Sequence, residues 1–387
     1  MVQGKDIILI SNQMLDDRYW TSKQYITMEL IKNNRVLYVE ANYSFGKLLS
    51  GMIGKKWPVV PFGRLQYEND NLSVLTPYPR LPYRNHFQWI GWLNQKLLLA
   101  IIRRAAKKLN FERPILWTFL HQTADLIGKL DESVAIYHCV DDWPERFVIN
   151  KMGRRSIIKV DESAILEKSD LVISVSPRLL VDYEILKAKY RFIENGVDLN
   201  SFSIKDTSPQ IPTDMNQISK PIIGFVGSIG DWIDLDLYKN LLFSFPDYSF
   251  VMIGLNERQK EIAQINQHPN FYYLGLKPQG KVVDYIQHFD VCLMPFNHSR
   301  IAEGLLPQKM FQYFAMGKPV VSTDSSPLKP FKKMLYLAEN TEQFVTNIQH
   351  ALEEDHNKMI DRIEFVKQYS WANRIKLYNN AIKEILN

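Results

Sequence analysis

Short apolar runs alternate with longer amphipathic stretches along nearly the whole chain. In the first half, the pattern predicts strands near 6–10, 35–40, 114–119, 133–139, 170–175 and 191–194, and helices near 20–33, 88–109, 122–130, 153–167 and 177–189. In the second half, it predicts strands near 221–227, 249–254, 271–274, 290–295 and 318–323, and helices near 233–243, 256–265, 280–288 and 307–316, with helical sequence from about 340. This alternation predicts an α/β fold, with parallel sheets covered by helices on both faces.

A polar segment that carries prolines interrupts the alternation at 203–220, and we interpret it as a linker. A length of 387 residues fits two domains. We predict a first domain over 1–202, a second over 221–368 and a closing helix over 369–387. Each domain is expected to be doubly wound and Rossmann-like. In such folds ligands bind outside the carboxyl ends of the strands, and here also in a cleft between the domains.

The composition is that of a globular protein, with 46% apolar and 23% charged residues. Cys139 and Cys292 both lie in apolar runs, which indicates buried thiols and gives neither a disulfide framework nor a metal-ligand spacing. The chain shows no signal sequence and no apolar run near the roughly 20 residues of a membrane span. We therefore expect a cytoplasmic protein.

The net charge of +5 belongs to the first half of the chain. Residues 1–198 hold 28 lysines and arginines against 22 acidic residues. Part of this excess lies in segment 87–109, where Trp89 and Trp92 precede four cations: Arg103, Arg104, Lys107 and Lys108. Such a helix fits an anionic membrane surface, and segment 45–57 is a second candidate. The alternative is a core helix with a solvated basic end. No nucleic-acid motif accompanies the charge, so we expect no nucleic-acid partner.

The stretch "PQKMFQYFAMGKPVVST" (307–323) predicts a helix, a turn at Gly317 and a buried strand. Pro307 suits the first helical position. Leu306 before it has no side-chain oxygen to cap the free amides. An uncapped helix N-terminus favours an anion, and Lys309 in the first turn would be a further ligand for it. The alternative is a surface helix whose amides meet water.

Two further strand ends point to the same edge of the sheet. In "PIIGFVGSIGDW" (221–232), Gly227 and Ser228 end a strand in a turn that lets a ligand approach the backbone. In "VCLMPFNHSRIAEG" (291–304), Arg300 and Glu303 lie in the loop just before the uncapped helix. Their convergence favours an anion site. The acids in "DLD" (234–236) fall at a helix start, which we prefer to a metal site.

The motifs of the second half resemble those of GT-B glycosyltransferases of the retaining family 4 type. They are "FIENGVDLNSF" (192–202), "IGFVGSIGDWIDLDL" (223–237), "FYYLGLKPQGKVVDYIQHFDVCLMPF" (271–296) and the stretch 307–323. Two first-domain motifs, "ISNQMLDDRYW" (10–20) and "VAIYHCVDDW" (134–143), resemble a bacterial surface-polysaccharide branch of the teichuronic-acid type. The closing "YSWANRIKLYNNAIKEIL" (369–386) is similar to the family's tail, which crosses back onto the first domain.

The resemblance implies a hexosyl-type glycosyltransferase of bacterial surface-polysaccharide synthesis. It also implies that the transfer retains the anomeric configuration of the sugar. A sugar would pass from a nucleotide-diphosphate donor on the second domain to a saccharide or lipid-linked acceptor on the first, at the inner membrane face. Lys309 and Arg300 would neutralise the leaving diphosphate, and amides near Gly227 and Ser228 would add donors. The resemblance implies no cofactor and no metal.

The sequence departs from the family at two positions. Gln312 stands where a glutamate normally grips the ribose hydroxyls, and a glutamine accepts such a bond without charge assistance. The partner glutamate would fall on Gly304, with Glu303 one place away.

In the first domain, His138 and Asp141 follow a strand and would position the acceptor or donor sugar. Asp142 is an equal alternative to Asp141, and a lone histidine after a strand is more often structural. Two other functions stay open: a nucleotide-sugar epimerase, and a non-catalytic nucleotide-sugar-binding protein.

Overall fold

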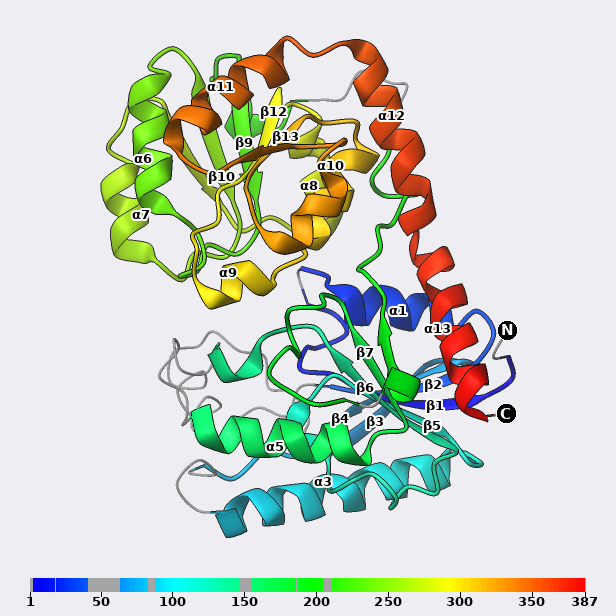
Figure 1. Ribbon diagram of the computed structural model, residues 1–387. Coiled ribbons are helices and arrows are strands. Elements are labelled where there is room, and N and C mark those ends of the chain that lie inside the picture. Colours follow the sequence, from blue (N-terminus) through cyan, green and yellow to red (C-terminus); the bar gives the residue numbers. More distant parts are fainter. Residues whose placement is uncertain are drawn as a thin grey trace. The chain divides into compact units, whose positions relative to one another are not determined.

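The computed structural model describes residues 3–17, 19–40, 63–82, 88–145, 155–185, 187–204 and 211–386 (Figure 1). The chain folds into two compact units. One comprises Met1–Asp17, Thr21–Glu194 and Arg374–Asn387, and the other comprises Arg18–Trp20 and Asn195–Asn373.

The first unit is built on an eight-stranded sheet with the order β3-β4-β2-β1-β5-β6-β7-β8. Its strands are β1 (Asp6–Ile10), β2 (Arg35–Val39), β3 (Arg64–Asn69), β4 (Leu72–Thr76), β5 (Ile115–Thr118), β6 (Val134–Cys139), β7 (Leu171–Ser174) and β8 (Tyr190–Phe192). Its helices are α1 (Ser22–Leu30), α3 (Gln88–Lys108), α5 (Arg155–Lys168) and, at the end of the chain, α13 (Trp371–Leu386). All neighbouring strands are parallel except β3 and β4, which form an antiparallel pair that the sequence pattern did not predict.

The helices predicted over 122–130 and 177–189 are wrong, because turns and short 3-10 segments stand there. Hydroxyl groups compete with the helical hydrogen-bond ladder at the start of both segments. Thr123 Oγ1 donates to the Leu120 carbonyl at 2.7 Å, and Ser174 Oγ donates to the Ser176 carbonyl at 2.6 Å. Hydrophobic periodicity alone does not predict these hydrogen bonds between side chains and nearby backbone.

The second unit contains a six-stranded, wholly parallel sheet with the order β11-β10-β9-β12-β13-β14. Its strands are β9 (Ile222–Val226), β10 (Ser249–Ile253), β11 (Phe271–Gly275), β12 (Val291–Met294), β13 (Val320–Thr323) and β14 (Tyr336–Ala338). Its helices are α6 (Leu235–Ser244), α7 (Gln259–Ile265), α8 (Gln279–Ile286), α9 (Arg300–Gly304), α10 (Gln308–Ala315), α11 (Thr341–Leu352) and α12 (His356–Val366). The strand order reverses between β9 and β12, so the carboxyl end of β9 is the switch point where doubly wound folds bind ligands. The predicted α/β fold with two parallel-sheet domains is confirmed.

The C-terminal helix α13 returns to the first unit, as expected from the tail motif. Its Tyr378 is fully buried and meets the rings of Trp117 and His138 edge-on, with centroids 5.3 and 5.4 Å apart. One turn earlier, Arg374 forms a 2.9 Å ion pair with Glu194. The helix is therefore part of the core of this unit.

The second unit begins at Asn195, earlier than the predicted linker at 203–220. Val197 and Phe202 are buried in the hydrophobic core of the second unit, and the Val197 amide donates to the Tyr369 carbonyl at 2.9 Å. Segment 195–202, which we expected to end the first domain, therefore packs with the second.

A buried polar cluster lies between β6 and α5 in the first unit. Glu162 is 1% exposed, and its two carboxylate oxygens accept hydrogen bonds of 2.7 Å from the hydroxyls of Tyr137 and Tyr183. Burial raises the pKa of Glu162 to about 7, against the lowering effect of the two tyrosine bonds, and the nearby charge of Asp142 raises it further. Folding therefore favours a protonated Glu162.

This pKa predicts how stability depends on pH. Because the pKa of Glu162 is raised in the folded state, the folded chain binds more protons than the unfolded chain between pH 4.5 and about 7. As the pH rises through this window, the free energy of unfolding should fall, by up to about 1.4 kcal/mol per pH unit. Denaturant melts should show a flatter pH profile for Glu162→Gln, whereas Glu112→Gln, at an exposed glutamate of the same unit, should keep the parent profile. Identical slopes for the parent and Glu162→Gln would contradict this assignment.

Candidate functional site

The turn after β9 brings two backbones unusually close together. Gly227 has a φ of +153° and Gly254 a φ of +147°, conformations that side chains rarely adopt. The Gly227 amide donates to the Ile253 carbonyl at 2.8 Å. A Cβ on Gly254 would collide with the Gly227 carbonyl. The end of β9 is thus tightly packed against the turn that follows β10.

The loop that follows Gly227 is held by its neighbours on both sides. The Ile229 amide donates to the Leu255 carbonyl at 2.8 Å, on the β10 side. On the β12 side, the Asp234 amide donates to the Pro295 carbonyl at 2.9 Å, and the Asn297 amide donates to the Trp232 carbonyl at 3.0 Å. The loop is therefore fixed before any ligand binds.

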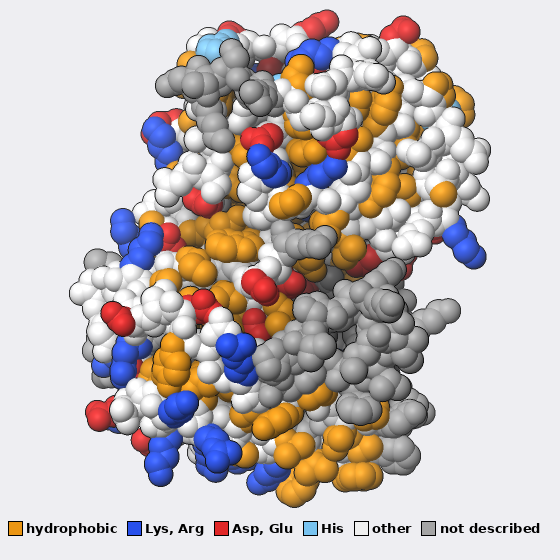
Figure 2. Space-filling model, turned by 180° about the vertical axis from the view of Figure 1, so that it is seen from behind, with side chains coloured by type: hydrophobic (Ala, Val, Ile, Leu, Met, Phe, Trp, Pro, Cys, Tyr) orange, Lys and Arg blue, Asp and Glu red, His pale blue; other side chains and the backbone are white. Residues whose placement is uncertain are grey.

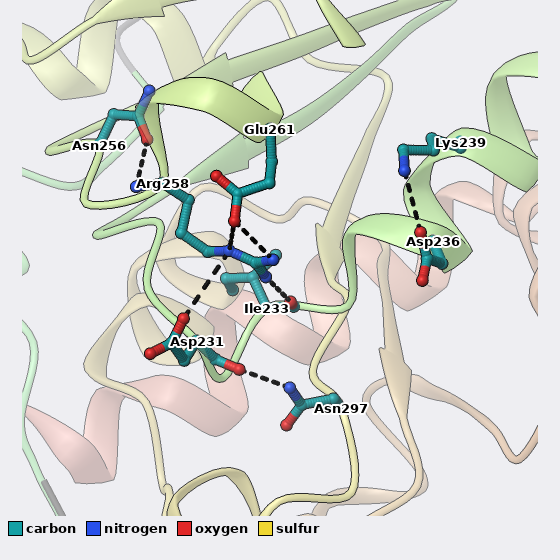
Figure 3. A network of polar contacts seen from close by, with 8 residues as sticks. All are labelled: Asp231, Ile233, Asp236, Lys239, Asn256, Arg258, Glu261 and Asn297. Atoms are coloured by element: carbon teal, nitrogen blue, oxygen red, sulfur yellow. Dashed lines mark hydrogen bonds and ion pairs between the residues drawn. The ribbon is translucent and has the colours of Figure 1, made fainter. Parts of the chain in front are cut away.

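Figure 3 shows the side chains that reinforce this loop. Arg258 lies among them, with its guanidinium 3.0 Å from Glu261 and 3.7 Å from Asp231. Asp236 pairs with Lys239 at 3.0 Å in the first turn of α6. Asp234 caps the same helix by accepting from the Leu237 amide at 2.8 Å. The acids of 234–236 therefore serve the helix start.

Lys309 meets the turn from α10. Its Cε and Nζ atoms fill the space that a Cβ on Gly227 would need, so a side chain at position 227 would displace the end of Lys309. The ammonium lies 5.5 Å from the centroid of the Phe225 ring. Within the part of the chain that the structure describes, it forms no hydrogen bond and no ion pair. Burial lowers the pKa of Lys309 to about 8.

The start of α10 leaves further polar groups without partners. Pro307 occupies the N-cap position, one residue before the predicted role, and supplies no capping side chain. The first turn contains no acid. Among the described residues, Gln308 Nε2 is buried without a hydrogen-bond partner, and the Gln312 amide, in a side chain 8% exposed, has none either. Several donors are thus available at one helix end.

Arg300 and Glu303 lie on the short helix α9. Arg300 is exposed at its first position, behind the cap Ser299, which accepts from the Ala302 amide at 3.4 Å. Glu303 is half-buried, 3.7 Å from the ring nitrogen of His298. The structure brings Lys309 to Gly227, with Ser228 partly exposed beside it, whereas Arg300 is exposed on α9.

In the first unit, His138 does not follow its strand but lies inside β6, fully buried. It stacks on Phe119 with centroids 4.8 Å apart. Burial and the charge of Lys23 lower the pKa of His138 to about 3, so it is neutral at physiological pH. Asp141 lies after the strand and is partly exposed, whereas the alternative Asp142 is buried. Of the histidine and the aspartate, only Asp141 can reach solvent.

Two further residues were not singled out from the sequence: Tyr313 on α10 and Ser325 after β13. Tyr313, one turn after Lys309, binds the backbone at the end of β9. Ser325 follows β13 with a buried hydroxyl that lacks a partner among the described residues. Ser325 could have been marked, because it lies two residues after the end of a predicted strand. Tyr313 could not, since its position on an apolar helix looked like ordinary core.

Comparison with known proteins agrees with the fold. The family model "Glycosyl transferases group 1" matches residues 220–354. Over 98% of both chains, the structure is similar to sucrose-phosphate synthase from Thermosynechococcus elongatus, with a TM-score of 0.73 and 14% identity. HepE from Anabaena, solved in complex with UDP, gives a TM-score of 0.66 with 13% identity over 98% of this chain and 99% of HepE. The structural similarity shows a GT-B fold, and the part of the chain at 220–354 matches the group 1 family model.

The chain is also similar to TuaH of Bacillus subtilis (strain 168), whose name assigns it to teichuronic acid biosynthesis as a glycosyltransferase. The two are 27% identical over 225 residues, and the match spans 56% of each chain. The resemblance to the teichuronic-acid branch is thereby confirmed.

The burial of Lys309 yields a prediction about stability. Because folding lowers its pKa from 10.5 to about 8, the unfolded chain binds more protons in this range, and the charge opposes folding at and below pH 8. Lys309→Met should therefore raise the free energy of unfolding at pH 7, by on the order of 1–3 kcal/mol. Lys260→Met, at an exposed lysine on α7 of the same unit, should change it little. A destabilised Lys309→Met protein in chemical denaturation would show that the ammonium has a stabilising partner.

Proposed function

We propose that this protein transfers a sugar from a nucleoside-diphosphate donor, held at the carboxyl end of β9, to a saccharide or lipid-linked acceptor of a bacterial surface polysaccharide. The observation that carries the proposal is the ammonium of Lys309 against the Cα of Gly227, without an ionic partner among the described residues. A partly buried cation that costs stability is retained where it meets an anion. The name of TuaH supports the pathway, and the UDP bound to HepE supports the donor.

The chemistry follows from charge. Departure of the donor's diphosphate builds negative charge on its oxygens while the sugar becomes oxocarbenium-like. Lys309 would stabilise that charge, and the amides at Gly227 and Ser228 would donate hydrogen bonds. Arg300 would add a second cation from α9, with Glu303 near the sugar. In this proposal the transfer retains the anomeric configuration, moves a hexosyl group and uses no metal.

Gln312 would hold the ribose of the donor. Its amide is nearly buried and unpartnered among the described residues, so it can bond to a hydroxyl. Gln312 also supports a second candidate function. A neutral amide in place of a carboxylate fits a protein that binds nucleotide sugars without turning them over. Release of free sugar or of transfer product from a panel of nucleotide sugars would favour the enzyme. Tight binding without turnover would favour the second candidate.

Asp141 would act on the acceptor side, because it is partly exposed after β6, whereas Asp142 is buried. His138 would serve this site by packing only. Its ring is neutral and fully enclosed, so it would support the strand that presents Asp141 and would not transfer a proton.

Nucleotide binding provides the direct test. UDP titrated into the parent protein, with ADP and GDP as alternatives, should bind in calorimetry. Lys309→Met should weaken binding by roughly 10- to 100-fold, the range of a charge-assisted hydrogen bond. Affinity in the parent should also fall as the pH rises through about 8, where the ammonium of the free protein loses its proton. Lys260→Met is the matched control, and equal affinities in all three proteins would remove this site from consideration.

A surface of the first unit supports a lipid-linked acceptor. Helix α3 exposes Trp89 by 63% and Trp92 by 57%, and Lys96 lies over the Trp92 ring at 5.4 Å. Its exposed cations nearer the C-terminus are Arg103, Arg104, Lys107 and Lys108. The helix contains no acidic residue. Figure 2 shows hydrophobic and cationic side chains together along the lower edge, where α3 lies.

We propose that this face of α3 rests on an anionic membrane. Exposed tryptophans suit the headgroup region, and cations beside them suit anionic lipid. No helix in the described ranges is long and apolar enough to cross a bilayer. Contact with the membrane would therefore be peripheral, at its inner face.

Liposome binding tests the membrane proposal. Vesicles that contain anionic lipid should retain the parent at low salt and release it as salt rises, because each cation contributes on the order of 1 kcal/mol and salt screens it. Replacing Arg103, Arg104, Lys107 and Lys108 with glutamine should abolish retention. The matched control replaces four exposed lysines of the second unit: Lys260, Lys281, Lys332 and Lys333. If the parent does not bind anionic vesicles at low salt, α3 is only a core helix with a solvated basic end.

A further inference from the structure

We infer that Tyr313 is a positioning residue, which holds Lys309 against Gly227 by bonding α10 to the end of β9. This inference rests on the proposed nucleotide site. Tyr313 is fully buried, and its hydroxyl accepts a hydrogen bond from the Val226 amide at 2.8 Å. The same hydroxyl lies 3.5 Å from the Val226 carbonyl, to which it donates. Both backbone groups of the last residue of β9 are thus bonded by one side chain.

The sheet leaves these two groups open. Successive amides of a strand point to opposite sides. The Gly227 amide is bonded on the β10 side, to Ile253, so the Val226 amide points toward β12. There the register of β9 with β12 includes only Ile223 and Gly224 in the described chain. Beyond Gly224 the two strands no longer pair, and Tyr313 supplies the missing partner.

Helical geometry links this bond to Lys309. Residues four positions apart lie one above the other on a helix face, so Lys309 and Tyr313 project together toward the end of β9. Tyr313 contacts Val226, and Lys309 contacts the next residue, Gly227. Lys309 has no polar tether of its own among the described residues. The hydroxyl of Tyr313 therefore sets the depth at which α10 presents the ammonium.

Packing alone does not explain a tyrosine here. Phenylalanine would fill the same space, but it would leave the Val226 amide buried without a partner, which is costly. Tyr238 on α6 offers a contrast, because it is equally buried and its hydroxyl has no hydrogen-bond partner in the described residues. Tyr238→Phe is therefore a matched control that removes a buried hydroxyl from the same unit without breaking a bond.

A double-mutant cycle separates positioning from a general structural role. UDP affinity is measured by calorimetry for the parent, Tyr313→Phe, Lys309→Met, the double variant and Tyr238→Phe. Tyr313→Phe should weaken UDP binding by roughly 3- to 10-fold in the parent. It should have less than a twofold effect in the Lys309→Met protein, since there is no ammonium left to position. Tyr238→Phe should bind as the parent does.

An equal loss from Tyr313→Phe in both backgrounds, or no loss in the parent, would overturn the inference. Hydrogen exchange on the unmodified protein tests the contact without relying on a variant: the Val226 amide should be protected, and fast exchange there would also overturn it. If the parent binds no nucleoside diphosphate at all, the proposed function fails first. If Lys309→Met loses affinity but Tyr313→Phe does not, only the positioning role fails.

Discussion

The ammonium of Lys309 occupies the space that a side chain at position 227 would fill, and the candidate site depends on this contact. A side chain at 227 would displace the ammonium, and the bond from the Val226 amide to Tyr313 holds α10 close to the end of β9. Gly254 has to be glycine for a related reason, because it packs on the Gly227 carbonyl. The result is a fixed turn with a cation beside it, at the switch point of a parallel sheet.

The two units treat buried charge in different ways. In the first unit, Glu162 is buried with two tyrosine hydroxyls bound to it, and His138 is buried in its neutral form. Both are therefore satisfied or uncharged. In the second unit, Lys309 is partly buried, and the described residues offer its ammonium only the aromatic face of Phe225. A fully satisfied group contributes to the fold, whereas a group that lacks its counter-charge points to a ligand.

Much of the fold could be predicted from the sequence, because the alternation of apolar strands and amphipathic helices is a strong local signal. It fails where side chains bond to nearby backbone, as at Thr123, and it misses the polar antiparallel strand β3. The uncapped start of α10 and its Lys309 could also be read from local residues. The role of Tyr313 could not, because its partner Val226 is 87 positions away. Nor could the burial of His138, which depends on helix α13.

The central claim is that the turn after β9 and the start of α10 bind the diphosphate of a nucleotide sugar. A crystal structure of the protein with UDP tests this most directly. We expect diphosphate oxygens within hydrogen-bond distance of Lys309 Nζ and of the amides around Gly227 and Ser228. We also expect a ribose hydroxyl at the Gln312 amide. UDP bound elsewhere, with Lys309 still lying only against Phe225, would contradict it.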